Sequence, residues 1–309
     1  MNTTESSLPG TAQDRSGGGT RDVSGLRRVL GWRPRTTRSK AGIAAVAAVG
    51  ATGLALALVA GPAGAATTKP AWMMTAGNVQ SLSGVDASTA SYFFNTPTAY
   101  GAGASLVKTP VQAHYATTPV LAYTSYAQFA SDIQTGAISY PYKWVMYDPE
   151  DWTATPVGER QDPVKYMTLF GQLAHANGLK VIQAPALDLG SVTGTVLPRL
   201  AGESINAWYM RVNIAGKAAA AGDIYLLQDE SNTTAAGGAY ASMFNTTQSQ
   251  ALAANASVRV FSEVSTVNGT ADQMASAAKS ISPDGFYVAA AGDIPTTDQF
   301  FQLMKTAGY

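Results

Sequence analysis

The chain has 309 residues, a formal net charge of zero and no cysteine, which excludes disulfides and thiolate metal sites. The zero total averages two unlike parts: residues 1–40 hold eight basic groups against three acids, whereas residues 66–309 hold twelve against seventeen. Because phosphate binding needs a basic surface, the mildly acidic body argues against nucleic acid as a partner.

The pattern of the N-terminal residues predicts an export signal. Residues 1–40 are rich in Ser, Thr, Gly and Arg without an apolar period, so we expect them to be disordered. Residues 41–61 carry no charge, and Pro62 and three small residues follow, which predicts a signal peptide over 41–65 cleaved before Ala66. The alternative is an uncleaved membrane anchor. The protein is therefore expected to be secreted, or anchored with its body outside and touching the membrane only through 41–65.

Residues 66–309 are expected to form one folded domain. The pattern of apolar residues that predicts strands and helices is weakest in its first part. Residues 72–74 are a candidate first strand and residues 91–94 a candidate second strand, both from short apolar runs. Residues 100–104 are expected to be a loop, and their glycines lack the strand and helix context of a phosphate-binding fingerprint.

From residue 119 onwards, short apolar runs alternate with helical patterns. Asp162 and Pro163 predict the start of one helix, as N-cap and first helical residue, and Gly178 predicts its end. A long helix is expected over 204–221. Further helices are expected over 126–134, 238–254, 270–280 and 297–306, and six strands start near residues 120, 144, 179, 224, 258 and 286.

This alternation predicts an α/β fold with parallel strands and helices outside. With the two upstream candidates the strand count reaches eight, and about 240 residues is the size of a (β/α)8 TIM-barrel-like domain. An open, doubly wound sheet is the alternative.

Acidic residues follow several of the expected strands. Asp148 and Glu150 come after the strand near 144, Asp229 and Glu230 after the strand near 224, and Glu263 after the strand near 258. Parallel strands end on the same side of a sheet, so we expect these acids to meet at the C-terminal mouth of a barrel.

Two carboxyl groups facing one cleft are the residues that glycoside hydrolysis requires. Glu150 is the candidate general acid, because an apolar strand and Trp152 beside it favour a raised pKa. Its candidate partners are Glu230 and Asp229, and Asp148 completes the candidate catalytic set. The remaining candidate residues would bind substrate: Tyr147, Trp152, Gln183, Asp188 and Glu263.

A non-catalytic use of the same residues remains open. Acids at strand ends also serve as helix caps, and the barrel could bind a carbohydrate or cell-wall ligand without turnover. No metal or other cofactor is expected, because the sequence has only two histidines, no HExxH motif and no DxDxDG calcium loop. The absence of a GxSxG motif argues against a Ser-His-Asp hydrolase.

The stretches YDPEDW at 147–152 and LKVIQAPALDL at 179–189, with the Asp-Pro helix start between them, carry a resemblance. They resemble uncharacterised secreted proteins of high-GC Gram-positive bacteria. More loosely, they are similar to glycoside-hydrolase-like TIM barrels whose strands end in Asp-x-Glu acids. The resemblance covers about residues 119–309 and implies a barrel that acts on a polysaccharide or glycoconjugate. The chain departs from the chitinase-like DxxDxDxE pattern, with Pro149 between its two acids.

Overall fold

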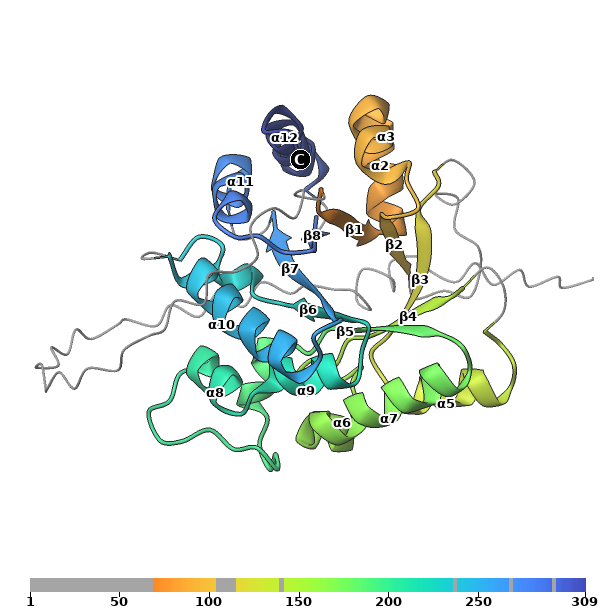
Figure 1. Ribbon diagram of the computed structural model, residues 1–309, viewed down its shortest axis with the longest axis vertical. Helices are drawn as coiled ribbons and strands as arrows, with labels where there is room; N and C mark the ends of the chain where they lie inside the picture. Colours follow the sequence, from red (N-terminus) through yellow and green to blue (C-terminus); the bar gives the residue numbers. More distant parts are fainter. Residues whose placement is uncertain (1–68, 104–114, 139–141, 236–237, 267–268, 291–292) are drawn as a thin grey trace, which may run out of the picture.

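A computed structural model describes residues 69–103, 115–138, 142–235, 238–266, 269–290 and 293–309 (Figure 1). The predicted leader and signal or anchor segment, residues 1–65, lie outside this described part. None of the helices in the described residues is long and apolar enough to cross a membrane.

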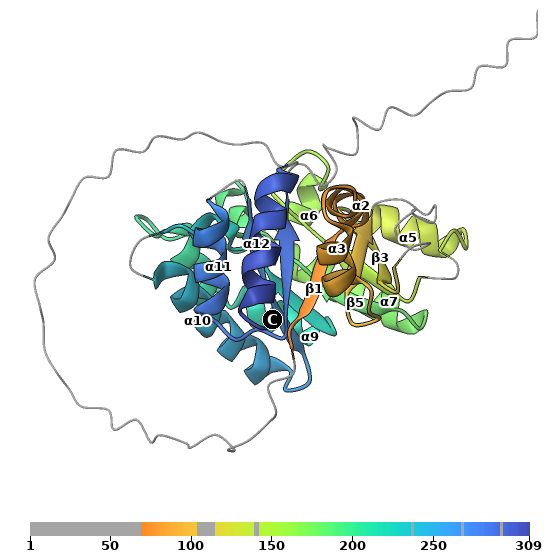
Figure 2. The same cartoon turned by 90° about the horizontal axis from the view of Figure 1, so that it is seen from above.

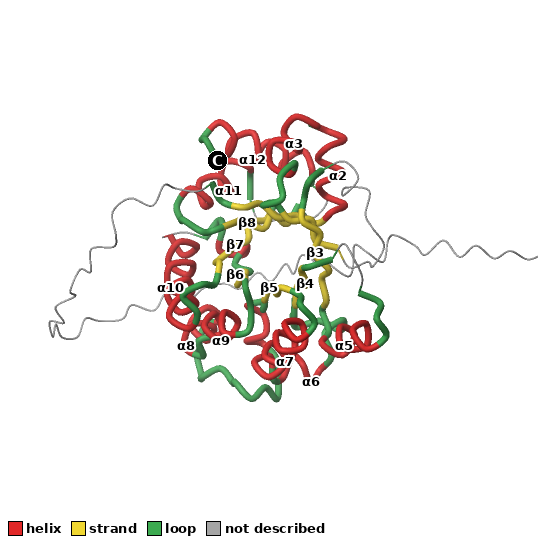
Figure 3. Tube along the Cα trace, turned by 45° about the vertical axis from the view of Figure 1, so that its right-hand side comes forward, coloured by secondary structure: helices red, strands yellow, loops and turns green. Residues whose placement is uncertain are grey.

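Eight parallel strands close into one barrel in chain order, with β1 paired to β8, which confirms the predicted TIM-barrel-like fold (Figure 3). The strands are β1 (Ala71–Thr75), β2 (Tyr100–Gly103), β3 (Thr118–Tyr123), β4 (Trp144–Tyr147), β5 (Lys180–Gln183), β6 (Ile224–Leu227), β7 (Arg259–Ser265) and β8 (Gly285–Ala289).

Helices surround the barrel, and α12 lies between α11 and α2 where the ring closes (Figures 1 and 2). The α-helices are α2 (Ala76–Val85), α3 (Ala87–Phe94), α5 (Tyr126–Gln134), α6 (Val157–Gln161), α7 (Pro163–Ala176), α8 (Ile205–Arg211), α9 (Ile214–Ala220), α10 (Ala239–Ala254), α11 (Ala271–Lys279) and α12 (Ile294–Thr306). Two short 3-10 helices, η2 (Leu187–Ser191) and η3 (Glu230–Asn232), follow the loops after β5 and β6.

Each strand sends alternate side chains to two separate cores, because successive strand residues point to opposite faces. Met146, Ile182 and Leu226 belong to a small core inside the barrel, whereas Tyr147 and Val181 belong to the large core between barrel and helices. This alternation decides which strand-end residues can reach the mouth.

The predicted helix start at Asp162 is confirmed. The Asp162 side chain accepts a hydrogen bond from the Lys165 backbone N–H at 3.3 Å, Pro163 is the first residue of α7, and Gly178 after its end has a positive φ of 71°. The structure adds the short helix α6 directly before α7, which the sequence pattern did not predict.

Two expectations for the N-terminal part of the barrel are wrong. Residues 91–94 end helix α3 instead of forming a strand, because Asp86 caps that helix and Phe93 and Phe94 pack on the outer core. Residues 100–103, expected as a loop, form β2. Tyr100 and Ala102 face the barrel interior, while glycines occupy the alternate positions, so the strand lacks the apolar pattern of its outer face.

The long helix expected over 204–221 is two helices. Asn213 between α8 and α9 has a left-handed backbone, φ 56°, and its side chain accepts a hydrogen bond from the Gly216 N–H at 3.0 Å. Asparagine tolerates this conformation better than most residues and then caps the new helix.

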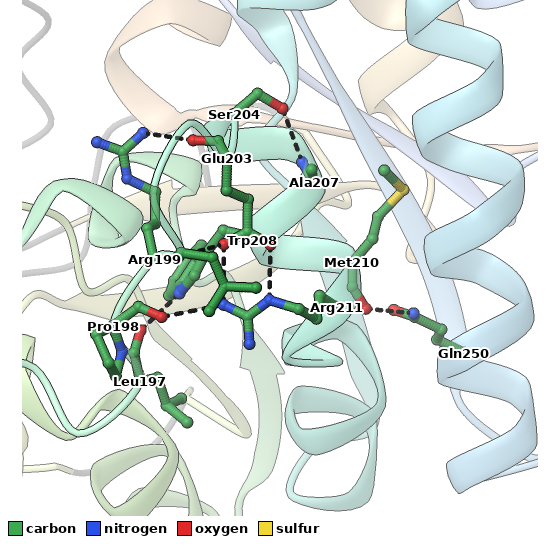
Figure 4. A network of polar contacts seen from close by, with 11 residues as sticks. Leu197, Pro198, Arg199, Glu203, Ser204, Ala207, Trp208, Met210, Arg211 and Gln250 are labelled. Atoms are coloured by element: carbon green, nitrogen blue, oxygen red, sulfur yellow. Dashed lines mark hydrogen bonds and ion pairs between the residues drawn. The ribbon is translucent and has the colours of Figure 1, made fainter.

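The chain segment that leads into α8 is fixed by charged side chains (Figure 4). Arg211 donates to both carboxyl oxygens of Glu203, at 2.6 and 2.9 Å, and to the Pro198 carbonyl at 3.0 Å. The indole N–H of buried Trp208 donates to the Leu197 carbonyl at 2.6 Å. These bonds hold the long connection after η2 against the outside of the barrel.

We expect Gly171→Ala to destabilise the fold strongly, because a Cβ at this position in α7 would lie 2.1 Å from the Ala221 backbone oxygen. Gly84→Ala in α2 is the matched control: a Cβ there meets nothing within 4 Å, so it should be neutral or add up to about 1 kcal/mol through helix propensity. Urea unfolding followed by circular dichroism measures both. Equal stability of the two variants would contradict the close α7–α9 packing.

Candidate functional site

One pocket opens where β4 to β8 end, and all of the charged residues that line it are acidic. Four carboxyl groups line it: Asp148, Glu150, Glu230 and Glu263. Met146, Ala184, Leu226, Gln228, Tyr287 and Ala289 complete the lining. Its cavity volume is about 70 Å³, against the roughly 10–15 Å³ that one water needs, so it admits a small polar group and not a whole sugar ring.

Asp148 lies deep in this pocket, only 6% exposed, and is held by Gln228. The Gln228 side-chain N–H group donates to Asp148 Oδ1 and, at 2.6 Å, to the Ala184 carbonyl oxygen. Burial raises the pKa of Asp148 to about 7, the Gln228 hydrogen bond opposes this, and the nearby acids Asp188 and Glu230 add to the rise.

Glu150 lies two residues further along the chain and is less buried than Asp148. Burial, followed by the charges of Asp148, Asp188 and Glu230, raises its pKa to about 9. Glu263, in register with Tyr287 on the neighbouring strand, is 6% exposed, and burial and the same crowding raise its pKa well above the usual range. Asp148, Glu150 and Glu263 therefore release their protons at a higher pH than ordinary Asp and Glu side chains do.

Three of the expected site residues lie behind the barrel wall and not in the pocket. The Tyr147 hydroxyl donates to Glu159 at 2.8 Å, and the Gln183 amide donates to the Met167 carbonyl at 3.0 Å. Asp229 accepts from the Ser262 hydroxyl at 3.1 Å and is fully buried. Each is adjacent in the sequence to a residue that lines the pocket. Because successive strand residues point to opposite faces, its side chain points away from the barrel interior.

Trp152 and Asp188 are not among the residues that line the pocket. Asp188 accepts a hydrogen bond from the Asp151 backbone N–H at 2.9 Å, and Arg160 pairs with the Asp151 carboxylate at 2.8 Å. The Trp152 backbone N–H donates to the Glu150 carbonyl at 2.9 Å. These contacts fix the loop that carries Glu150, so Asp188 acts on the pocket through its charge and through this loop.

Gln228 and Tyr287 are pocket residues that the sequence reading missed. Both lie two residues from another position on the inner face of the same strand, so counting in steps of two along the strand finds them. Gln228 lies between Leu226 and Glu230 in this count, and Tyr287 lies two residues after Gly285. Strand boundaries were needed to use this signal. Among the described residues, no group of three or more His, Asp or Glu side chains is arranged to hold a metal ion.

Comparison of the chain with models of known protein families and with curated protein sequences gives no match.

The raised pKa values predict that stability falls as pH rises. Glu150 ionises near 4.5 in an unfolded chain and near 9 in the folded protein, so between these values the folded state binds more protons and its free energy of unfolding decreases with pH. Asp148 adds to the slope between about 3.8 and 7. We expect Glu150→Gln to flatten the slope between pH 5 and 9, measured by urea unfolding at several pH values.

Glu203→Gln is the control for this experiment. The Arg211 hydrogen bond lowers the pKa of Glu203 to about 2, so this group is ionised in both states above pH 5 and the variant should keep the wild-type slope. Stability that is constant from pH 5 to 9 in the wild type would contradict the buried acid cluster.

Proposed function

We propose that this chain is an exported glycoside-hydrolase-like barrel protein that cleaves a polysaccharide or glycoconjugate at the mouth of the barrel. The observation that carries the proposal is the position of Glu150: a carboxyl group with a pKa of about 9, next to three other carboxyl groups in one pocket. An acid that keeps its proton at neutral pH beside further carboxyl groups is the arrangement that this reaction uses.

In this proposal Glu150 is the general acid. Its proton goes to the glycosidic oxygen as the bond from that oxygen to the anomeric carbon breaks, and the new hydroxyl leaves with the proton. Glu150 suits the role because it lies at the rim of the pocket, less buried than Asp148 and Glu263. A polymer too large for the 70 Å³ cavity can therefore still reach it.

Glu230 is the proposed partner carboxylate. It also lies at the rim, partly exposed, at the start of η3 after β6. As a base it takes a proton from the water that attacks the anomeric carbon; as a nucleophile it attacks that carbon itself, and water then releases the sugar. The anomer of the first product, read by ¹H NMR, distinguishes inversion from retention. Asp229, the other candidate partner, faces the outer core and has no role in this scheme.

Export is part of the proposal and rests on the uncharged stretch 41–61 after a basic leader. Expression of the full chain with its own N-terminus tests it. Mass spectrometry of protein recovered from the medium should give an N-terminus at Ala66, whereas full-length protein that stays with the cells would contradict cleavage.

The catalytic test is a Glu150→Gln variant on a panel of soluble polysaccharides and oligosaccharides. We expect turnover to fall by about 10²- to 10⁴-fold, the usual contribution of a general acid, while binding survives because the isosteric amide keeps the shape of the side chain. Glu203→Gln, whose side chain does not line the pocket, should keep full activity. Binding without turnover in the wild type would instead support a carbohydrate-binding protein on the same barrel, and turnover that Glu150→Gln leaves unchanged would refute the assigned role.

A further inference from the structure

We propose that the innermost part of the pocket binds a protonated amine, so that the substrate is a glycan with free amino groups, such as a polymer of 2-amino-2-deoxy sugars. The inference rests on the proposed function, since it assigns a substrate class to the same pocket. It starts from two side chains that the catalytic scheme leaves unused, Asp148 and Glu263.

The first argument is the lack of a positive partner. Asp148 and Glu263 are each 6% exposed, and no Lys or Arg is among the residues that line the pocket within the described part of the chain. Buried carboxyl groups are normally paired with a cation or supplied with several donors. Here no cation from the lining residues pairs with the two acids, so a cationic ligand can supply the complementary charge that favours their ionised form.

The second argument is the state of Glu263. Within the residues that the structure describes, no hydrogen-bond donor reaches its carboxyl group, although it is more than nine-tenths buried and lines the cavity. Asp148, by contrast, is held by the Gln228 amide. An acceptor that is fixed in a cavity without a donor is suited to a ligand that brings donors.

The third argument is size and shape. The cavity volume of about 70 Å³ has room for an ammonium group, which is about as large as a water molecule, and for the carbon that carries it. An ammonium has three donors and a full charge, so it can serve both Asp148 and Glu263, whereas a sugar hydroxyl offers one donor and no charge. Tyr287, in register with Glu263, adds an aromatic side chain beside the cation.

The fourth argument links this subsite to the reaction. In a 2-amino sugar the amine is on the carbon next to the anomeric carbon. An ammonium held between the two innermost acids therefore places the glycosidic bond further out, at the rim where Glu150 and Glu230 lie. One pocket thus has an inner layer that selects the amine and an outer layer that acts on the bond.

Proton release gives the inference a readout that does not need turnover. The pocket acids hold protons in the free protein, and a cationic ligand favours their ionised form, so binding must expel protons. If one proton leaves per ligand bound, affinity rises about tenfold per pH unit from pH 5 to 7. A neutral ligand has no reason to show either effect.

The experiment is isothermal titration calorimetry of the full chain with three probes of equal length: tetramers of glucosamine, of N-acetylglucosamine and of glucose. Each is titrated at pH 5, 6 and 7 in buffers of different ionisation enthalpy, which reports the protons released. We expect the glucosamine tetramer to bind at least tenfold more tightly than the other two at pH 7, with proton release. Glu263→Gln should remove most of this preference, and Glu203→Gln should keep it.

The comparison among the three probes on the wild-type protein decides the inference even if Glu263→Gln fails to fold, and Asp148→Asn is the second variant. The inference is overturned if the neutral tetramers bind as tightly as the glucosamine tetramer, or if the glucosamine tetramer binds without proton release. Cleavage of neutral tetramers that depends on Glu150 overturns the inference and leaves the proposed function standing. Glucosamine binding with proton release and no cleavage supports the amine subsite and refutes the hydrolase. Failure of all three probes to bind or to be cleaved overturns the inference.

Discussion

Burial of several carboxyl groups in one pocket at the barrel mouth, reinforced by the repulsion among them, is the constraint on which the site depends. Another buried acid shows the contrast. Glu159, 2% exposed, receives four hydrogen bonds, and they come from Ser125 Oγ, the Tyr126 and Ala127 backbone N–H groups and the Tyr147 hydroxyl. That carboxylate caps helix α5 and stabilises the fold. Asp148 has one donor side chain, and no donor from the described residues reaches Glu263, so their burial costs stability and points to a ligand.

The barrel tolerates this cost because its two ends are built differently. At the end where the strands begin, Arg259 donates to the Tyr100 hydroxyl at 2.8 Å and its guanidinium lies 5.0 Å from the Phe261 ring, so a hydrogen bond and aromatic packing close the interior. The large outer core holds the strands from behind. The four acids of the pocket lie together at the mouth, on a rigid scaffold that keeps them close together, as a site for acid–base chemistry requires.

Much of the fold could be predicted from the sequence, since the alternation of apolar runs and helices after residue 119 predicts parallel strands with helices outside. The choice of a barrel over an open sheet depended on the two upstream strands. The prediction was wrong where local pattern and tertiary packing disagree, at 91–94 and 100–103, because β2 has glycine at every second position and no outer apolar face. For the site, the strand-end acids were visible, but the side that each one faces was not. A shift of one residue separates Glu230 in the pocket from Asp229 behind the wall, and only strand register resolves it.

The most direct test of the central claim is a ¹³C NMR titration of the side-chain carboxyl carbons of Asp and Glu, assigned with single Asp→Asn and Glu→Gln variants. The account predicts that Glu150 titrates well above pH 7, that Asp148 titrates near 7, and that Asp148→Asn lowers the midpoint of Glu150, because the ionised Asp148 carboxylate raises the pKa of Glu150. If both carboxyl groups titrate between about pH 4 and 5, as free side chains do, the acids do not form one buried cluster and the account of the site is wrong.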